Sequence, residues 1–301
     1  YRLIHSDSDG FPGIFLDRFD GFAVIQGEKA PPPAEFQKIE RELEPLGVNS
    51  FYFKQLKRKP GSSDIEQAMP RHLSGKIAPD RFSARENGLH YNISFVEGYS
   101  VGIFLDQREN RRRLLSSCIT PGWNIPPAGK VLNTFAYTCA FSVAAARAGH
   151  QVTSLDLSSK YLDWGKQNFA LNDLPLTNHD FIFGDTFSWL KRFRNKSRLF
   201  DLILLDPPTF SRSRESGVFQ VEKDYGRLVA SALAVLSPRG ILFASTNSAT
   251  LHPDKFMELI KSGVSESKRK ILKEQFYSQP PEFPTNSEVA PYLKTVWLQL
   301  D

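Results

Sequence analysis

The sequence predicts a doubly wound, Rossmann-like α/β domain preceded by a small α+β unit. Between residues 130 and 246, five short runs rich in Val, Ile and Leu alternate with segments of helix length. The runs are apolar throughout, as in a parallel sheet covered on both faces. They are Lys130–Phe135, Gln151–Leu157, Asp180–Asp185, Asp201–Asp206 and Gly240–Thr246. We therefore expect ligands at the carboxyl ends of these strands.

The amphipathic segments between and after these runs predict the helices of the same domain. They are Ser142–Ala148, Lys160–Asn172, Tyr225–Leu236 and Pro253–Ser265. Upstream, alternating apolar residues on both sides of Asn87–Gly88 predict a β-hairpin that leads into a further strand. We assign residues 81–301 to this domain, with the hairpin at its amino end.

Residues 1–80 predict a small accessory domain. Two apolar runs around Asp20–Gly21 indicate a hairpin. Residues 31–47 begin with prolines and end at Gly47, as a helix does. The run Ser50–Lys57 predicts a strand, and the polar stretch Lys59–Asp80, with its Gly and Pro residues, predicts an exposed loop or linker.

Composition excludes several classes of protein. Hydrophobic residues make up 41% and charged residues 24%, as in ordinary globular proteins, and no apolar run approaches the roughly 20 residues that span a bilayer. We expect no membrane partner. The 38 basic against 33 acidic residues favour polyanionic partners only weakly.

Two cysteines and six histidines limit the chemistry further. The cysteines give no disulfide framework, which fits a reducing compartment, so we expect a cytoplasmic protein. An organellar location stays open because the chain opens at Tyr1 rather than Met. No HxxxH or CxxC spacing occurs, and we expect no metal site.

Polar residues stand at successive strand ends: Asn133–Thr134, Asp156, Asp185 and Asp206. In a doubly wound sheet these positions converge, and an acid after the second strand can accept hydrogen bonds from ribose hydroxyls. Asp156 is the candidate for that role; alternatively it caps the helix that begins near Ser158. No GxGxxG or GxxxxGK[ST] occurs, which argues against a dinucleotide dehydrogenase and a nucleoside triphosphatase.

The segment DPPTF, from Asp206 to Phe210, is the most specific local motif. Pro207 and Pro208 fix the backbone and remove donors, so that Asp206 and nearby carbonyls can accept from a base edge. Phe210 offers a face on which a flipped-out base can stack. Alternatively, the prolines only terminate the strand and Phe210 packs in the core.

Several segments together resemble a known family. They are GIFLDQRENRR, VLNTFAYTCAFSVAAARAG, LDLSSKYLDWGKQNFALN, DLILLDPPTFSRS and STNSATL. Together they resemble the large-subunit 23S rRNA methyltransferase group known as RlmI/RlmK. The resemblance implies an S-adenosylmethionine-dependent methyltransferase with a seven-stranded sheet, whose last, antiparallel strand is PYLKTVWLQL. It also implies that residues 1–80 correspond to an RNA-interacting domain, and we expect that the small RNA-binding domain that often precedes it in the family has no counterpart in this sequence.

The resemblance assigns roles to individual residues. It places Asn133, Thr134 and Phe135 at the methionine part of S-adenosylmethionine, Asp156 at the ribose, Asp185 near the adenine, and Gln107 and Arg108 over the cofactor. We add Ser158 and Asp206 to this cofactor set, and take Asp206, Pro207, Pro208 and Phe210 as catalytic. Two departures from the family bear on cofactor affinity. Cys139 replaces the usual Gly of the turn, and Asn133 replaces the usual Asp.

The target atom is constrained by cysteine chemistry. Methylation of cytosine carbon 5 needs a cysteine thiolate, which that branch of the family carries after the fifth strand. Ser245–Leu251 holds no thiol here, and we interpret Cys139 and Cys118 as structural. A ring nitrogen or an exocyclic amine is therefore the favoured target, since neither needs a thiolate.

Basic clusters are the candidate RNA contacts, although such clusters often only form a solvated surface. They are Lys54, Lys57, Arg58 and Lys59, then Arg111–Arg113, then Arg212 and Arg214. Two other functions remain open: a catalytically silent RNA-binding homologue, and a methyltransferase of a small molecule or protein amine. The sequence does not decide between a monomer and a homodimer.

Overall fold

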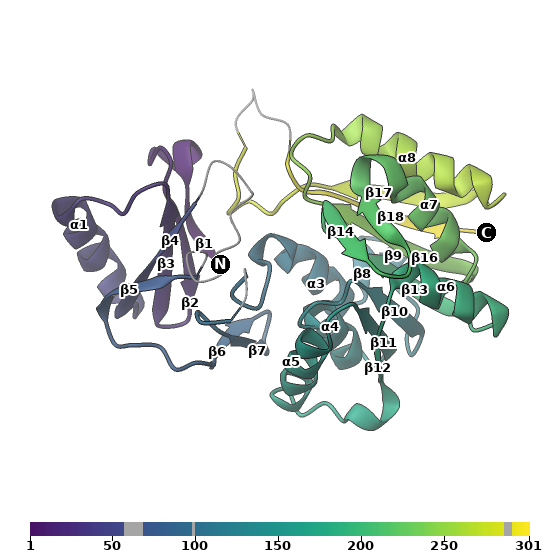
Figure 1. The fold of residues 1–301 in the computed structure, drawn as a ribbon, viewed down its shortest axis with the longest axis horizontal. Coiled ribbons are helices and arrows are strands. Elements are labelled where there is room, and N and C mark those ends of the chain that lie inside the picture. The colour runs from purple at the N-terminus through teal and green to yellow at the C-terminus, as the bar shows by residue number, and fades with distance from the viewer. Residues whose placement is uncertain (57–68, 98–99, 286–290) are drawn as a thin grey trace. The chain divides into compact units, whose positions relative to one another are not determined.

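The computed structural model describes residues 1–56, 69–97, 100–285 and 291–301 (Figure 1). It divides into two compact units. The N-terminal unit comprises Tyr1–Arg108 and Pro280–Asn286, and the C-terminal unit comprises Glu109–Gln279 and Ser287–Asp301. The sequence predicts a domain boundary after residue 80, whereas residues 81–108 group with the N-terminal unit in the structure.

The N-terminal unit contains a five-stranded sheet of order β1-β2-β3-β4-β5. Its elements are β1 (Arg2–His5), β2 (Phe15–Phe19), β3 (Phe22–Gly27), helix α1 (Pro33–Leu43), β4 (Ser50–Gln55) and β5 (Arg71–Gly75). Apolar residues of the sheet and of α1 form one core, which includes Leu16, Ile25, Ile39 and Phe51. The predicted hairpin at Asp20, the helix and the strand from Ser50 are thus confirmed.

The predicted loop over residues 59–80 is wrong at Arg71–Gly75, which pair as β5 with β4. The run RHLSG carries little apolar alternation, so only the exposed edge of β4 makes it a strand. Residues 59–68 of the prediction, together with Lys57, lie outside the described residues, as does Arg58.

The hairpin at Asn87–Gly88 is confirmed as β6 (Phe82–Glu86) paired with β7 (Leu89–Ile93). Both turn residues have positive φ, 51° and 79°, as a type I′ turn requires. The further strand predicted after the hairpin is wrong. Leu105–Gln107 form a 3₁₀ turn that continues into α3 (Arg108–Leu115).

The C-terminal unit is built on a seven-stranded sheet of order β12-β11-β10-β13-β16-β18-β17, which confirms the Rossmann-like prediction. Its strands are β10 (Lys130–Thr134), β11 (Gln151–Asp156), β12 (Asp180–Phe183), β13 (Phe200–Leu205), β16 (Leu236–Thr246), β17 (Ile271–Tyr277) and β18 (Lys294–Leu300). The five predicted strands are parallel, and β18 is antiparallel to β16. Edge strand β17 was not predicted, because three consecutive residues of its run are polar or charged.

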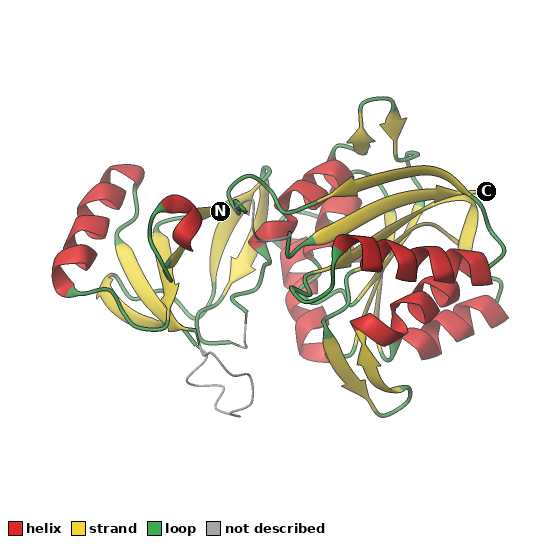
Figure 2. Cartoon of the chain, turned by 90° about the horizontal axis from the view of Figure 1, so that it is seen from above, coloured by secondary structure: helices red, strands yellow, loops and turns green. Residues whose placement is uncertain are grey.

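Helices cover both faces of this sheet (Figure 2). They are α4 (Ala140–Arg147), α5 (Ser159–Ala170), α6 (Thr186–Asn195), α7 (Val221–Leu233) and α8 (Pro253–Glu266). Helices α6, α7 and α8 share one apolar core with the sheet. Helix α6 was not predicted, because the basic residues among its apolar residues obscure the amphipathic pattern. Two short ribbons complete the unit: β8 (Cys118–Thr120) with β9 (Trp123–Asn124), and β14 (Phe210–Ser213) with β15 (Gly217–Gln220). Within the described residues, no helix combines the length and apolarity of a membrane span.

Helices α7 and α8 approach one another through two glycines. A Cβ on Gly263 would collide with the carbonyl oxygen of Gly226 and lie 2.7 Å from Cβ of Val229. A Cβ on Gly226 would lie 3.1 Å from the carbonyl oxygen of Leu259. The close packing of these two helices therefore depends on the absence of side chains at both positions.

We predict that Gly263→Ala destabilises the protein by about 1–3 kcal/mol, the usual cost of overpacking a core. Ser265→Ala, at an exposed position of the same helix, is the control and should change stability by less than about 0.5 kcal/mol. Urea unfolding followed by circular dichroism measures both. Equal stabilities of the two variants would contradict the packing argument.

Candidate active site at the carboxyl ends of the parallel strands

The turn after β10 has an unusual backbone. Phe135, Tyr137 and Cys139 all have positive φ, at 54°, 49° and 62°, although none is glycine. Such conformations cost about 1–3 kcal/mol each and persist only where the surroundings impose them. The alternating turn also resembles the backbone arrangements that bind anions or polar ligand groups.

Three hydrogen bonds from neighbouring elements impose this conformation. The Ala136 amide donates to the carbonyl of Leu155 at 3.0 Å, and the Asn168 side chain donates to the carbonyl of Thr138 at 2.8 Å. The Tyr137 amide donates to Oδ2 of Asp156 at 2.8 Å. The turn is therefore tied to β11 and α5 and is held in one shape.

Asp156 ends β11 and accepts a second hydrogen bond, from the Ser158 amide to Oδ1 at 2.8 Å. The cap of α5 is Ser158 itself, whose hydroxyl accepts from the Tyr161 amide at 3.3 Å, so the predicted capping role of Asp156 is wrong. Burial raises the pKa of Asp156, although the backbone amides of Tyr137 and Ser158 partly offset the rise. A carboxylate has about four acceptor positions, so both oxygens can still accept from a ligand.

The side chains of Asn133 and Thr134 point into the protein. Asn133 is 1% exposed and donates to the hydroxyl of Ser142, and Thr134 is fully buried and donates to the carbonyl of Leu204. Neither residue is exposed, and their predicted contact with the methionine part of the cofactor stays a prediction. Phe135, by contrast, is half-buried and its ring lies 6.2 Å from that of Phe219.

Asp185 is the cap of α6 and is 5% exposed. Its Oδ1 accepts from the Ser188 amide at 3.0 Å, and its Oδ2 accepts from the hydroxyl of Ser216 at 2.6 Å. Burial raises the pKa of Asp185, but the hydrogen bonds from Ser216, Ser188 and Ser213 together hold it below its ordinary value. Asp185 thus connects β12 to the turn of the β14–β15 ribbon.

The DPPTF segment leaves the sheet at the end of β13 and opens this ribbon. Pro207 is buried, Pro208 is exposed, and Phe210 is 57% exposed on β14. The alternative in which Phe210 packs in the core is therefore wrong. Tyr225 of α7 fixes the end of β16. Its hydroxyl donates to the carbonyl of Ser245 at 2.9 Å and accepts from the Ser245 amide at 2.8 Å. The sequence analysis did not single out Tyr225.

Hydrogen bonds from a buried lysine fix the backbone of the loop after β16. The ammonium of Lys294, fully buried, donates to the carbonyls of Ser248 and Tyr292 at 2.5 and 2.8 Å. Burial lowers the pKa of Lys294 to about 8. Asn247 is exposed between the buried residues Thr246 and Ser248, so its amide is presented by an immobilised backbone. Sequence patterns gave no signal for Lys294, because a lysine that opens a strand is usually solvated.

Two exposed apolar side chains lie beside Asp156 and were missed. Leu157 is 40% exposed and Phe183 is 63% exposed, and Phe183 pairs in register with Asp156. The sequence contained a signal for Leu157. An apolar residue that directly follows a polar strand end, as Leu157 follows Asp156, lies beyond the buried part of the strand. Gly184 follows, and a Cβ there would collide with the indole of Trp189.

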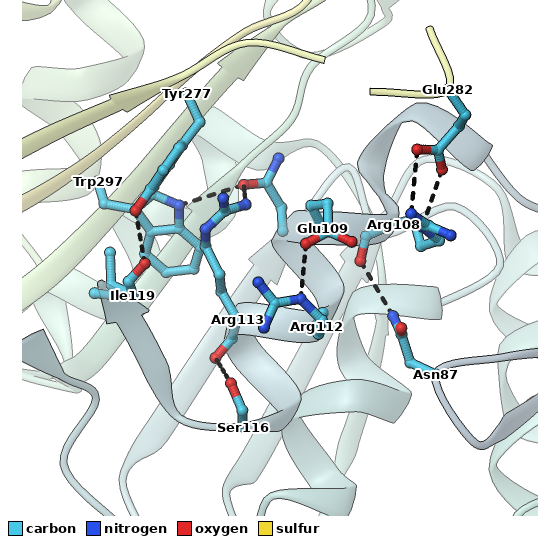
Figure 3. Close-up of polar contacts among 11 residues, drawn as sticks. Asn87, Arg108, Glu109, Arg112, Arg113, Ser116, Ile119, Tyr277, Glu282 and Trp297 are labelled. Carbon is cyan, nitrogen blue, oxygen red and sulfur yellow. Dashed lines mark hydrogen bonds and ion pairs between the residues drawn. The ribbon is translucent and has the colours of Figure 1, made fainter. Parts of the chain in front are cut away.

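The remaining predicted cofactor residues belong to the N-terminal unit. Gln107 is 3% exposed, and the guanidinium of Arg108 pairs with Glu282 at 3.0 Å (Figure 3). The Asn87 side chain donates to the carbonyl of Arg108 at 3.2 Å. Their predicted position over the cofactor stays a prediction.

Four of the cations proposed as RNA contacts are engaged with protein. Arg111 is 2% exposed, so its predicted surface role is wrong. Arg113 lies over the ring of Tyr277 at 3.5 Å, and Arg112 pairs with Glu109 at 2.7 Å (Figure 3). Lys54 is half-buried, and burial lowers its pKa. Arg212 and Arg214, in contrast, are exposed at the β14–β15 ribbon.

Neither cysteine has the surroundings of a nucleophile. Cys139 is fully buried, and burial raises its pKa to about 12, against the partial effect of hydrogen bonds with Ser154 and Ser142. Its sulfur packs so closely on Gly165 of α5 that a Cβ there would collide with it. Cys118 is half-buried in β8. The burial of Cys139 agrees with a structural role, and the structural role of Cys118 stays a prediction. Among the described residues, no three His, Cys, Asp or Glu side chains gather as metal ligands.

Comparison with known proteins identifies the family. Residues 2–299 match the model of the S-adenosylmethionine-dependent methyltransferases. The chain belongs to this family. A ribosomal RNA large subunit methyltransferase of Deinococcus radiodurans is 34% identical over all of this chain and 72% of its own length. Ribosomal RNA large subunit methyltransferase I of Cronobacter sakazakii is 30% identical over 99% of this chain and 73% of its own. The resemblance to the RlmI/RlmK group is thereby confirmed.

A solved methyltransferase structure matches the fold of this chain. It is a crystal structure described as a methyltransferase complexed with SAH, with a TM-score of 0.84 and 32% identity over 99% of this chain and 74% of its own. The methyltransferase therefore uses S-adenosylmethionine, as predicted.

The side chains at the strand ends of the methyltransferase fit that cofactor. Asp156 offers carboxylate oxygens that suit sugar hydroxyls, and the exposed Leu157 and Phe183 beside it offer apolar surface that suits a flat base. These three side chains thus provide the hydrogen-bond acceptors and the apolar surface that a nucleoside needs.

We predict that Asp156→Asn weakens S-adenosylmethionine binding about tenfold or more, because hydrogen bonds to a charged group contribute about 1.5–3 kcal/mol. In the parent protein, affinity should fall as the pH drops through the raised pKa of Asp156, since the protonated carboxyl accepts less well. This loss should begin at a higher pH than the ordinary Asp value of about 3.9.

Calorimetric titration with S-adenosylmethionine between pH 4.5 and 8 measures both effects. Asp173→Asn changes an exposed carboxylate after α5 and should keep the parent affinity. An Asp156→Asn variant that binds like the parent at pH 7 would remove Asp156 from the cofactor site.

Proposed function

We propose that this methyltransferase modifies a base of RNA, within large-subunit rRNA, at a ring nitrogen or an exocyclic nitrogen. The names of the relatives from Deinococcus radiodurans and Cronobacter sakazakii support the substrate class. The observation that carries the proposal is the exposed ring of Phe210, directly after the strand end that holds Asp206. An aromatic face at the carboxyl edge of the sheet suits a base taken out of its stack.

In this proposal the cofactor lies at the ends of β10, β11 and β12. Asp156 accepts from the ribose hydroxyls, and Leu157 and Phe183 flank the adenine. Asn133, Thr134 and Phe135 shape the turn beside the methionine part, and Ser158 and Asp185 position the helices that follow. The bound cofactor supplies an electrophilic methyl group on its sulfonium.

The residues of DPPTF then act on the base. Phe210 stacks on it, and Pro207 and Pro208 keep the backbone rigid, so that the acceptor nitrogen is held in line with the methyl group. Asp206 accepts a hydrogen bond from an exocyclic amine or a ring N–H. Asn247 carries both a donor and an acceptor in its exposed amide and is a candidate for the base edge.

The burial of Cys139 and the lack of a cysteine after β16 support a nitrogen target. Cysteine-dependent methylation of cytosine carbon requires a thiolate, and the thiol of Cys139 has a pKa of about 12 because it is buried. The segment Ser245–Leu251 carries no cysteine. A nitrogen lone pair needs only correct placement.

We predict that Phe210→Ala lowers kcat/KM for RNA methylation about 5- to 150-fold, since stacking of one base contributes about 1–3 kcal/mol. Affinity for S-adenosylmethionine should stay unchanged, because Phe210 contacts the substrate only. The assay follows labelled methyl transfer to rRNA from cells that lack this protein, and mass mapping of the product locates the nucleotide.

Leu272→Ala is the matched control, since Leu272 is an exposed apolar residue of edge strand β17. Labelled product that survives ribonuclease would favour a small molecule or a protein amine instead. A protein that binds rRNA but not S-adenosylmethionine would be a silent homologue. Equal kcat/KM of the parent and Phe210→Ala would remove the proposed stacking role.

A further inference from the structure

Helix α6 carries cations without any compensating acid. From Thr186 to Leu199 the chain contains five Lys or Arg residues and neither Asp nor Glu. Four of them are exposed on or just after the helix: Lys191, Arg192, Arg194 and Lys196. Asp185, at the start of the helix, is buried and bonded to two serines, so it does not neutralise this face.

Five other helices pair at least one of their cations with an acid of the same helix. Each has an ion pair between residues three or four positions apart, namely Lys38–Glu42, Arg112–Glu109, Lys166–Asp163, Arg227–Asp224 and Lys255–Glu258. In the described chain, none of the four exposed cations of α6 has an acidic partner; Arg192 lies over the ring of Trp189 at 4.9 Å. Repulsion among these cations is unfavourable, so a bound anion would stabilise α6.

Stabilisation of the helix dipole explains only part of this pattern. Cations in the last turn of a helix are favourable by about 0.3–1 kcal/mol each, which covers Arg192 and Arg194. The effect falls off beyond the last turn and does not require that acids be absent from the rest of the helix. The dipole therefore does not account for Lys191 or for the lack of acids on this face.

The start of helix α6 contacts the β14–β15 ribbon of the proposed substrate side. Phe187 of α6 packs near Phe219 of β15 with ring centroids 6.2 Å apart, and Arg227 of α7 lies over the Phe187 ring at 4.2 Å. Ser216, in the turn of the ribbon, donates to Asp185. The strand opposite carries the exposed residues Phe210 and Arg212, and the exposed Arg214 opens the turn. The start of α6 therefore packs against the ribbon that carries them.

We propose that the outer face of α6, formed by Lys191, Arg192, Arg194 and Lys196, binds phosphates of the single-stranded RNA that flanks the target base. The inference rests on the proposed RNA substrate and adds a docking surface to it. Exposed cations and an exposed aromatic ring on one structural unit are the combination that single strands bind. A membrane surface fits less well, because none of the exposed large apolar side chains of the described chain lies on α6.

The test uses Lys191→Gln/Arg192→Gln/Arg194→Gln in the full chain, with a fluorescent 20-nucleotide RNA of mixed sequence as the probe. Each lost phosphate contact lowers the slope of log K against log salt by about 0.7, so the triple variant should lose about 2 in slope. Its affinity should fall about tenfold or more at low salt. In the rRNA methylation assay, KM should rise while kcat at saturating RNA stays at the parent value.

The control is Lys255→Gln/Lys261→Gln/Lys270→Gln, which makes the same charge change at exposed positions on and after α8. It should retain the parent slope. Equal losses in both variants would reduce the effect to net charge and overturn the inference. A parent slope in the α6 variant, with rRNA methylation intact, would overturn the docking surface and leave the proposed function standing. A parent that neither binds nor methylates RNA would overturn both, and vesicles of anionic lipid would then probe α6.

Discussion

The hydrogen bond from the Tyr137 amide to the Asp156 carboxylate is the interaction on which the rest of the site depends. It links the turn after β10 to the end of β11, and the same carboxylate accepts the Ser158 amide before α5 begins. One side chain therefore fixes two adjacent turns at the carboxyl edge of the sheet. The conformational cost of three positive φ angles is tolerable there because these partners, with Asn168, leave the turn no alternative.

A second set of contacts fixes the substrate side. Tyr225 joins the ends of β13 and β16 through Leu205 and Ser245, and Lys294 holds the loop after β16. The β14–β15 ribbon is anchored on its inner face by Phe219, which is buried, and at its turn by Ser216. The outer face is left to Phe210 and Arg212. Rigid support beneath exposed polar and aromatic groups is what a site needs when it orients a base without activating it.

Some predictions followed from local chemistry and others did not. Asn87–Gly88 specifies a type I′ turn because both residues tolerate positive φ, and the apolar runs that end at Thr134 and Leu205 specify buried parallel strands. The strand at Arg71–Gly75 carries no such pattern and exists because β4 offers an unpaired edge. Arg111 reads as a surface cation in the sequence, but it is buried within the C-terminal unit.

The sequence by itself determined the α/β class, the five segments that form parallel strands and the polar residues at their ends, since these follow from apolar periodicity and turn chemistry over a few neighbouring residues. It also placed Asp156 and the DPPTF segment correctly at strand ends. Tertiary structure alone decided which side chains are available. It buried Asn133, Thr134 and Cys139, and it exposed Leu157, Phe183 and Phe210. It also left the exposed cations of α6 without an acidic partner among the described residues. Exposure and pairing depend on residues distant in the chain, which local patterns do not record.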